Sequence, residues 1–168
     1  MWSKHEGQAA VHSVEDLVSL VNRVDVCYLF KKGEHPRVCD MVKESDSTVR
    51  RGLVLGWSEE AHLKKKLFLS VDEKGSLLLL SSKKVRELPE DWSQKGLSRD
   101  EKTLLEVLDH PMSTPELREA AHLPKQRFEN ALIGLRAKMR LALVGVRKES
   151  KTKHINVFDK IGKWDSTA

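Results

Sequence analysis

Residues 113–145, STPELREAAHLPKQRFENALIGLRAKMRLALVG, decide the fold of this chain. Ser113 with Glu116, or Thr114 followed by Pro115, can start a helix of about two turns. Residues 122–124 are too few for anything but a tight turn, and a longer helix is expected from residue 125 to about residue 140. The stretch therefore predicts two helices joined by a tight turn.

The longer helix has one apolar stripe and one polar face. The stripe consists of Phe128, Ala131, Leu132, Leu135 and Met139, which recur at helical spacing. At 100° per residue, the opposite face holds Gln126, Asn130 and Ala137, with Gly134 nearby. We expect the stripe to pack on the preceding helices, and the small residues Gly134 and Ala137 to allow close approach of a ligand to the other face.

The segments before and after residues 113–145 add a third helix and a hairpin to the two predicted helices. Upstream, Ser98 and Glu101 form a capping box for a helix that ends before Pro111. Its apolar face is expected to consist of Leu104, Leu105 and Leu108. Downstream, a strand over 141–147, a basic loop over 148–153 and a strand over 154–158 form a hairpin. Three helices followed by a hairpin predict a winged helix-turn-helix over 97–164.

The first half of the chain predicts a second small module of mixed structure. The expected elements are a helix over 14–23, a strand over 26–30, a short helix over 36–42, a loop over 44–48, a strand over 52–57, a helix from Ser58 to about residue 66, and a hairpin of strands 67–70 and 76–80. The predicted fold class is α+β with tandem winged-helix-like modules. The predicted organisation is a flexible N-terminus 1–12, a winged-helix-like module 13–90, a linker 91–96, the winged helix-turn-helix 97–164 and a tail 165–168.

Charge is distributed unevenly along the chain. The 168 residues carry 30 Lys and Arg against 25 Asp and Glu, a net charge of +5. Residues 122–154 alone hold nine basic and two acidic side chains, whereas residues 1–121 are slightly acidic. The excess positive charge therefore lies on the predicted helix-turn-helix and its wing, which indicates an anionic partner for that module.

Nine residues of this basic segment are candidates for contact with double-stranded DNA. Amide side chains can pair bidentately with adenine, and Lys and Arg can hold phosphates. The candidates are Lys125, Gln126, Arg127, Asn130, Arg140, Arg147, Lys148, Lys151 and Lys153. The alternative is that these charges form an ordinary solvated face of a module that packs on protein, and Ile133 and Glu129 near the exposed face favour it.

Motifs for other functions are missing from the sequence. Cys27 and Cys39 have neither the spacing of a metal site nor that of a disulfide scaffold. There is no Gly-rich phosphate loop, no GxSxG element and no HExxH, so we expect no cofactor, no metal and no catalytic residue. No apolar run has the length of a membrane span. A cytoplasmic protein with no membrane partner is expected.

Four stretches carry a resemblance to a known family: SVEDLVSLVNRVDVCYLF at 13–30, GWSEEAHLKKKLFL at 56–69, residues 113–145 and VFDKIGKW at 157–164. The order of these pieces resembles the AlkZ-type DNA glycosylases and their short AlkZ-related proteins. The resemblance implies tandem winged-helix units and a role in DNA repair or transcription regulation. Those enzymes act through a Gln-x-Gln or Gln-x-Asp element, and neither Gln8, Gln94 nor Gln126 begins one, so no catalytic residue is carried over.

The sequence thus favours a duplex DNA-binding winged-helix protein, a non-catalytic relative of the AlkZ-type glycosylases that is regulatory or associated with repair. Two alternatives remain. One is an active DNA glycosylase whose catalytic residues have diverged, and the other is an interaction module that joins a protein partner or forms a homodimer.

Overall fold

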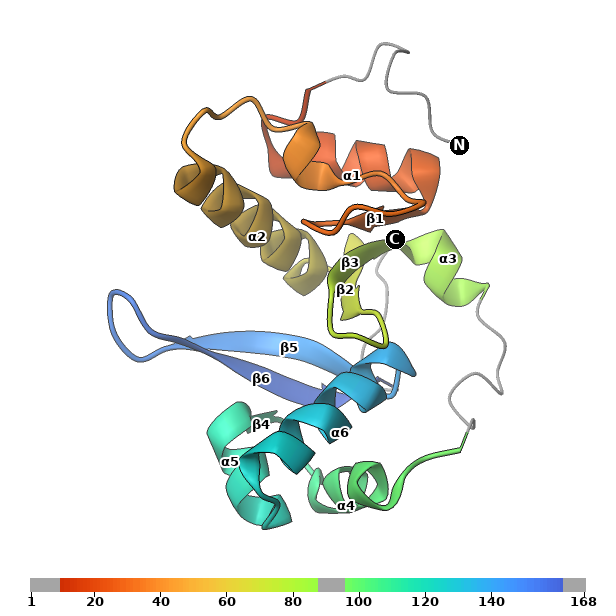
Figure 1. The fold of residues 1–168 in the computed structure, drawn as a ribbon, viewed down its shortest axis with the longest axis vertical. Helices are drawn as coiled ribbons and strands as arrows, with labels where there is room; N and C mark the ends of the chain where they lie inside the picture. Colours follow the sequence, from red (N-terminus) through yellow and green to blue (C-terminus); the bar gives the residue numbers. More distant parts are fainter. Residues whose placement is uncertain (1–9, 88–95, 162–168) are drawn as a thin grey trace. The chain divides into compact units, whose positions relative to one another are not determined.

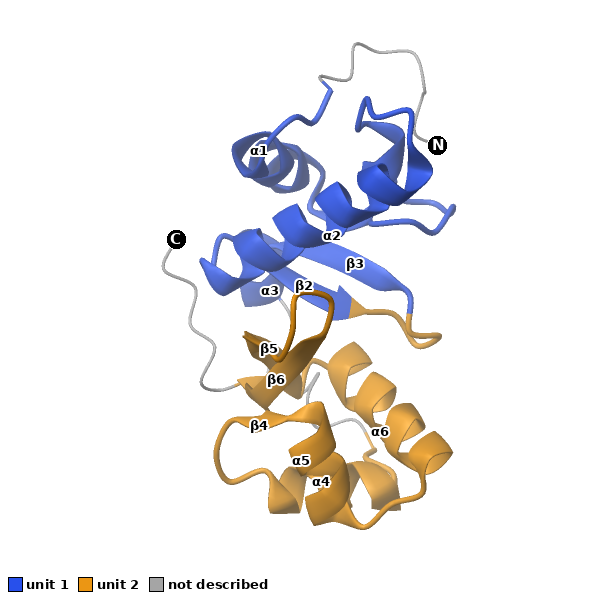
Figure 2. Ribbon diagram, turned by 90° about the vertical axis from the view of Figure 1, so that its left-hand side faces the viewer, with its two compact units in different colours: residues 1–70, 76–88, 166–168 blue, residues 71–75, 89–165 orange. Residues whose placement is uncertain are grey.

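The computed structural model describes residues 10–87 and 96–161, which belong to two compact units (Figures 1 and 2). The described part of the first unit is 10–70 and 76–87, and that of the second is 71–75 and 96–161. Each unit combines helices with a small three-stranded antiparallel sheet, which confirms the predicted α+β class. The predicted linker, N-terminus and tail lie almost entirely outside the described residues.

The first unit has helices on a sheet of strand order β1-β3-β2. Its elements are α1 (Val14–Val24), β1 (Val26–Tyr28), η1 (Val38–Asp40), α2 (Ser47–Leu63), β2 (Leu67–Val71), β3 (Leu77–Ser81) and α3 (Ser82–Arg86). The predicted first helix is confirmed, with Ser13 as its N-cap accepting a hydrogen bond from the Asp16 backbone. The short helix α3 was not predicted. Leu17, Val54 and Phe68 are fully buried in this unit.

The predicted strand over 52–57 and the predicted helix start at Ser58 are wrong, because all these residues lie inside helix α2. The helix begins earlier, because the Asp46 carboxylate accepts hydrogen bonds from the backbone N–H groups of Thr48 and Val49. Ser58 is buried inside the helix, where its hydroxyl donates to the Val54 carbonyl at 2.7 Å. The error has a physical cause: a short apolar run fits a strand as well as a buried helical segment.

The second unit contains α4 (Arg99–Val107), β4 (Met112–Ser113), α5 (Thr114–Ala121), α6 (Lys125–Ala137), β5 (Leu141–Lys148) and β6 (His154–Lys160). Both predicted capping boxes are present, Ser98 with Glu101 and Ser113 with Glu116. The sheet order is β4-β6-β5, with β5 and β6 antiparallel. The strand β4 was not predicted. Helix α6 ends before residue 140, because Met139 adopts a left-handed conformation with φ of 59°.

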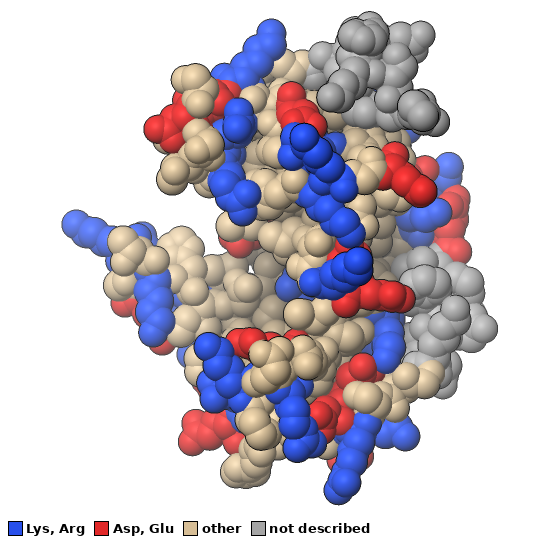
Figure 3. All heavy atoms as spheres, in the orientation of Figure 1, with Lys and Arg blue, Asp and Glu red and all other residues tan. Residues whose placement is uncertain are grey.

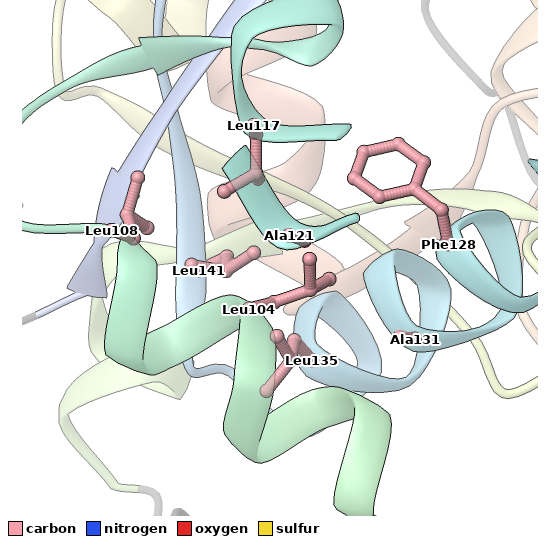
Figure 4. Close-up of a cluster of buried hydrophobic side chains, with 8 residues drawn as sticks. All are labelled: Leu104, Leu108, Leu117, Ala121, Phe128, Ala131, Leu135 and Leu141. Atoms are coloured by element: carbon pink, nitrogen blue, oxygen red, sulfur yellow. The ribbon is translucent and has the colours of Figure 1, made fainter. Parts of the chain in front are cut away.

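The core of the second unit lies between its three helices and the start of β5 (Figure 4). It consists of Leu104, Leu108, Leu117, Ala121, Phe128, Ala131, Leu135 and Leu141. The predicted stripe of α6 is therefore in phase, since Phe128, Ala131 and Leu135 are buried and Leu132 packs against them. Leu105 is half-buried at the edge of this cluster, and Leu104 occupies the centre.

Candidate nucleic-acid interface

The turn between α5 and α6 sets the start of the longer helix. His122 ends α5 in the left-handed conformation, with φ of 54°, and Pro124 is the N-cap of α6 without a side-chain hydrogen bond. Phe128 anchors the first turns of α6 in the core. The exposed residues of α6 all lie in its N-terminal half: Lys125, Gln126, Arg127, Glu129 and Asn130.

The two predicted base-reading amides lie one turn apart and contact each other. The Gln126 Nε2 donates a hydrogen bond to the Asn130 Oδ1 at 3.0 Å. A side-chain amide has two donor hydrogens and an oxygen with two lone pairs. The contact therefore orients both amides and still leaves each of them a donor and an acceptor for a ligand.

Arg127 is held by the helix next to it. Its Nε and Nη2 donate to the two oxygens of Asp100, in the first turn of α4, at 2.9 and 2.6 Å. This hydrogen-bonded pair raises the pKa of Arg127 and lowers the pKa of Asp100. Arg127 was predicted from the sequence as a phosphate contact, but its partner Asp100, which neutralises its charge locally, was not.

The tip of the β5–β6 hairpin is an ordered basic turn. The Ser150 hydroxyl accepts a hydrogen bond from the Lys153 backbone N–H at 3.0 Å, and the Glu149 N–H donates to the Lys153 carbonyl at 2.9 Å. Lys and Arg side chains gather at this end of the hairpin in Figure 3. The predicted residues here are all exposed: Arg147, Lys148, Lys151 and Lys153.

Two of these hairpin cations have acidic partners. Arg147 lies 3.4 Å from a carboxylate oxygen of Glu116 on α5, and Lys153 lies 3.3 Å from Glu149 in the turn itself. The other two lysines of the hairpin, Lys148 and Lys151, have no ion pair to any residue that the structure describes.

Arg140 lies apart from the other predicted residues. It follows α6 at the end opposite to Lys125, about 20 Å away along a helix that rises 1.5 Å per residue. Its side chain is half-buried, and its carbonyl accepts a hydrogen bond from the Ile161 N–H at 3.0 Å. The structure thus brings Arg140 to the base of the hairpin, not to its tip.

Gly134 faces α4, which corrects its predicted place beside the exposed face of α6. A Cβ at this position would lie 2.5 Å from the Glu101 Oε1. Glu101 is buried and is bonded to the Lys138 Nζ at 2.6 Å. The glycine therefore allows α4 to approach α6, and Ala137 is half-buried as well. No sequence spacing indicated this contact, because the two residues meet only when the helices pack.

No family model matches the chain, and no curated protein is significantly similar to it. Within residues 10–87 and 96–161, no three His, Cys, Asp or Glu side chains form a group that could hold a metal ion. Among the described helices, none is both long and apolar enough to cross a membrane.

Proposed function

We propose that the second unit is a winged helix-turn-helix that binds duplex DNA. In this proposal α5 and α6 are the helix-turn-helix, α6 is the recognition helix, and the β5–β6 hairpin is the wing. The order of helices and strands in the unit supports this assignment. A recognition helix contacts base edges with its N-terminal residues.

The exposure pattern of α6 is the observation that carries the proposal. Its exposed polar side chains lie in the N-terminal half, where Gln126 and Asn130 already orient each other. Its C-terminal half faces α4 at Gly134, and the C-cap residue Lys138 bonds Glu101 of α4. Only the N-terminal half is thus available to enter a major groove, and that half carries the side chains suited to adenine.

The charges around this half suit the DNA backbone. Lys125, Lys148 and Lys151 have no ion pair to any described residue and are exposed. If each of them neutralises one phosphate, the logarithm of the affinity falls with the logarithm of the salt concentration with a slope of about −2.7. Arg127 and Arg147 contribute less to this charge, because Asp100 and Glu116 partly neutralise them.

The proposal includes a relation to the AlkZ-type glycosylases. In it the chain is a non-catalytic relative of these enzymes that is regulatory or associated with repair. Gln126, the one glutamine within the described ranges, lies exposed and bonded to Asn130. Base excision needs a pocket around an extruded nucleotide. The position of Gln126 on an open helix face supports contact with duplex DNA over catalysis.

A binding titration tests this proposal with a matched pair of variants. Lys148→Ala with Lys151→Ala should weaken binding to every duplex and flatten the salt slope by up to about two units. The control is Lys102→Ala with Lys160→Ala, which removes two exposed lysines of the same unit from α4 and from the base of β6. Equal affinities for all three proteins, or affinity for a protein partner without affinity for DNA, would favour the interaction-module alternative.

A further inference from the structure

The centre of the exposed face of α6 is formed by two neutral amides. Gln126 and Asn130 lie about 40° apart around the helix axis, at about 100° per residue. The buried residues Phe128, Ala131 and Leu135 lie on the opposite side of the helix. A helix that bound DNA through phosphates alone would carry cations at this central place. The two amides instead favour contact with base edges.

The charged side chains of α6 lie around this pair. Lys125 and Arg127 lie about 100° from Gln126, one on either side of it. Glu129 is exposed and lies between Lys125 and Gln126 around the helix axis. A phosphate repels a carboxylate, so Glu129 disfavours a phosphate next to the two amides. The cations are therefore placed for the two phosphate backbones of a groove, and the amides for the bases between them.

The hydrogen bond between the amides has a direction that makes them unequal. The Gln126 Nε2 donates to the Asn130 Oδ1 at 3.0 Å, so the Asn130 oxygen points toward the preceding turn of α6. Asn130 keeps both of its N–H donors and the second lone pair of its oxygen. An amide whose oxygen accepts a hydrogen bond is polarised, which strengthens its own N–H donors. Asn130 thus presents a complete donor and acceptor edge in a fixed orientation.

We propose that Asn130 recognises the adenine of one A·T pair in the major groove, and that Gln126 is a positioning residue that holds the Asn130 amide in the required orientation. The inference rests on the proposed function, because it assigns base selectivity to the same helix. Adenine presents its N7 as an acceptor and its N6 amino group as a donor. The Asn130 Nδ2 donates to N7, and its Oδ1 accepts from N6 while it also accepts from Gln126.

The fixed orientation of the Asn130 amide explains why the other bases are rejected. Guanine presents two acceptors, N7 and O6, in the major groove. A freely rotating amide could turn its N–H groups toward both of them. The bond from Gln126 holds the Asn130 oxygen in place, so that this oxygen would face O6, acceptor against acceptor. We therefore expect the preference for adenine over guanine to depend on Gln126 as well as on Asn130.

Selection from a pool of duplexes with randomised central base pairs tests the inference on the full chain. Sequencing of the bound fraction should show enrichment of one fixed A·T pair. Replacing this pair by G·C, or its adenine by 7-deazaadenine, which lacks the N7 acceptor, should weaken binding about tenfold. Duplex binding without any base preference would overturn the inference and leave the proposed function intact. Binding to no duplex at all would overturn both.

Asn130→Asp tests which side chain contacts the base. Aspartate still accepts the hydrogen bond from Gln126, but it has no donor for N7, and a carboxylate accepts from the N4 amino group of cytosine. The same selection should therefore enrich cytosine in place of adenine. Lys125→Ala is the contrasting variant, because it should weaken binding to all duplexes alike and keep the enriched adenine. Enrichment of the same adenine by Asn130→Asp would show that another residue recognises it.

Two charged variants of Gln126 test its positioning role. Gln126→Glu has no donor for the Asn130 oxygen and should lower the ratio of affinities for the A·T and G·C duplexes about tenfold. Gln126→Lys donates to the same oxygen and should keep most of this ratio. Taking the ratio cancels the uniform effect of each charge change on binding to DNA. Loss of the ratio in both variants, or in neither, would contradict the positioning role of Gln126.

Discussion

Arg127 on α6 donates two hydrogen bonds to Asp100 in the first turn of α4, at 2.9 and 2.6 Å. The pair connects the candidate recognition helix to its neighbour. It also gives Arg127, a cation that could contact a phosphate, a carboxylate partner within the protein. The same ion pair therefore supports the packing of α6 and lowers the positive charge of the proposed DNA-binding surface.

Removing the Asp100 charge is expected to strengthen DNA binding. In Asp100→Asn the Arg127 guanidinium loses its ionic partner and becomes available to a phosphate. The affinity for duplex should rise, and the salt slope should steepen by about 0.9. Fluorescence anisotropy at several salt concentrations measures both quantities.

Glu106→Gln is the matched control for this variant, because it removes one exposed carboxylate from the same helix. Its effect on affinity should be smaller and limited to the change in net charge. If the two variants bind DNA equally, Arg127 does not reach the backbone when released from Asp100.

Acidic conditions should weaken the contribution of the same pair to folding. The bonds from Arg127 lower the pKa of Asp100 in the folded state below its ordinary value. Because the folded-state pKa is lower than the unfolded-state pKa of about 3.9, the ionised carboxylate stabilises the fold above that pH. This stabilisation disappears as the pH falls through the folded-state pKa. Urea unfolding of wild type and Asp100→Asn should differ at pH 7 and converge at strongly acidic pH. A difference that is independent of pH would exclude this linkage.

Alanine at position 134 should destabilise the second unit. The added Cβ would lie 2.5 Å from the Glu101 Oε1 and would displace a carboxylate that bonds Lys138 and caps α4. We expect a loss of about 1–3 kcal/mol in the free energy of unfolding, measured by chemical denaturation. Gly52→Ala, at an open position in α2, is the contrasting case and should be neutral or stabilising. Equal stabilities for the two variants would place Gly134 away from α4.

The two thiols should react at very different rates. Burial raises the pKa of Cys27 to about 12, so its reactive thiolate is scarce at neutral pH. Cys39 is only half-buried, although burial raises its pKa too. Mass spectrometry of iodoacetamide-treated native protein should detect modification at Cys39 first, and both thiols should react in denaturant. Early modification of Cys27 in the native protein would contradict its burial.

Local signals explain how much of the fold the sequence could predict. The capping boxes at Ser98 and Ser113 and the stripe through Phe128 are encoded within a few residues, so the helices of the second unit were located to within three residues. The first part of helix α2 was missed, because the apolar residues within 52–57 were interpreted as a strand and the helix was expected to begin only at Ser58. The glycines do not interrupt a helix whose buried face packs on α1 and the sheet.

The candidate site was also predicted only in part from the sequence. The exposed position of Gln126 and Asn130 follows from helical spacing and was predicted. The pairing of Arg127 with Asp100 joins residues 27 positions apart, and only the packing of α4 on α6 brings them together. Position 134 was misassigned for that reason as well.

Chemical-shift mapping of the full chain with a short duplex tests the proposed function most directly. If α6 and the wing contact DNA, the backbone amides of residues 125–130 and 147–153 should shift in proportion to the duplex added, while those of Lys64 and Lys102 stay unchanged. Shifts confined to other segments, or the same spectrum with and without duplex at low salt, would contradict the assignment of this unit as a DNA-binding winged helix.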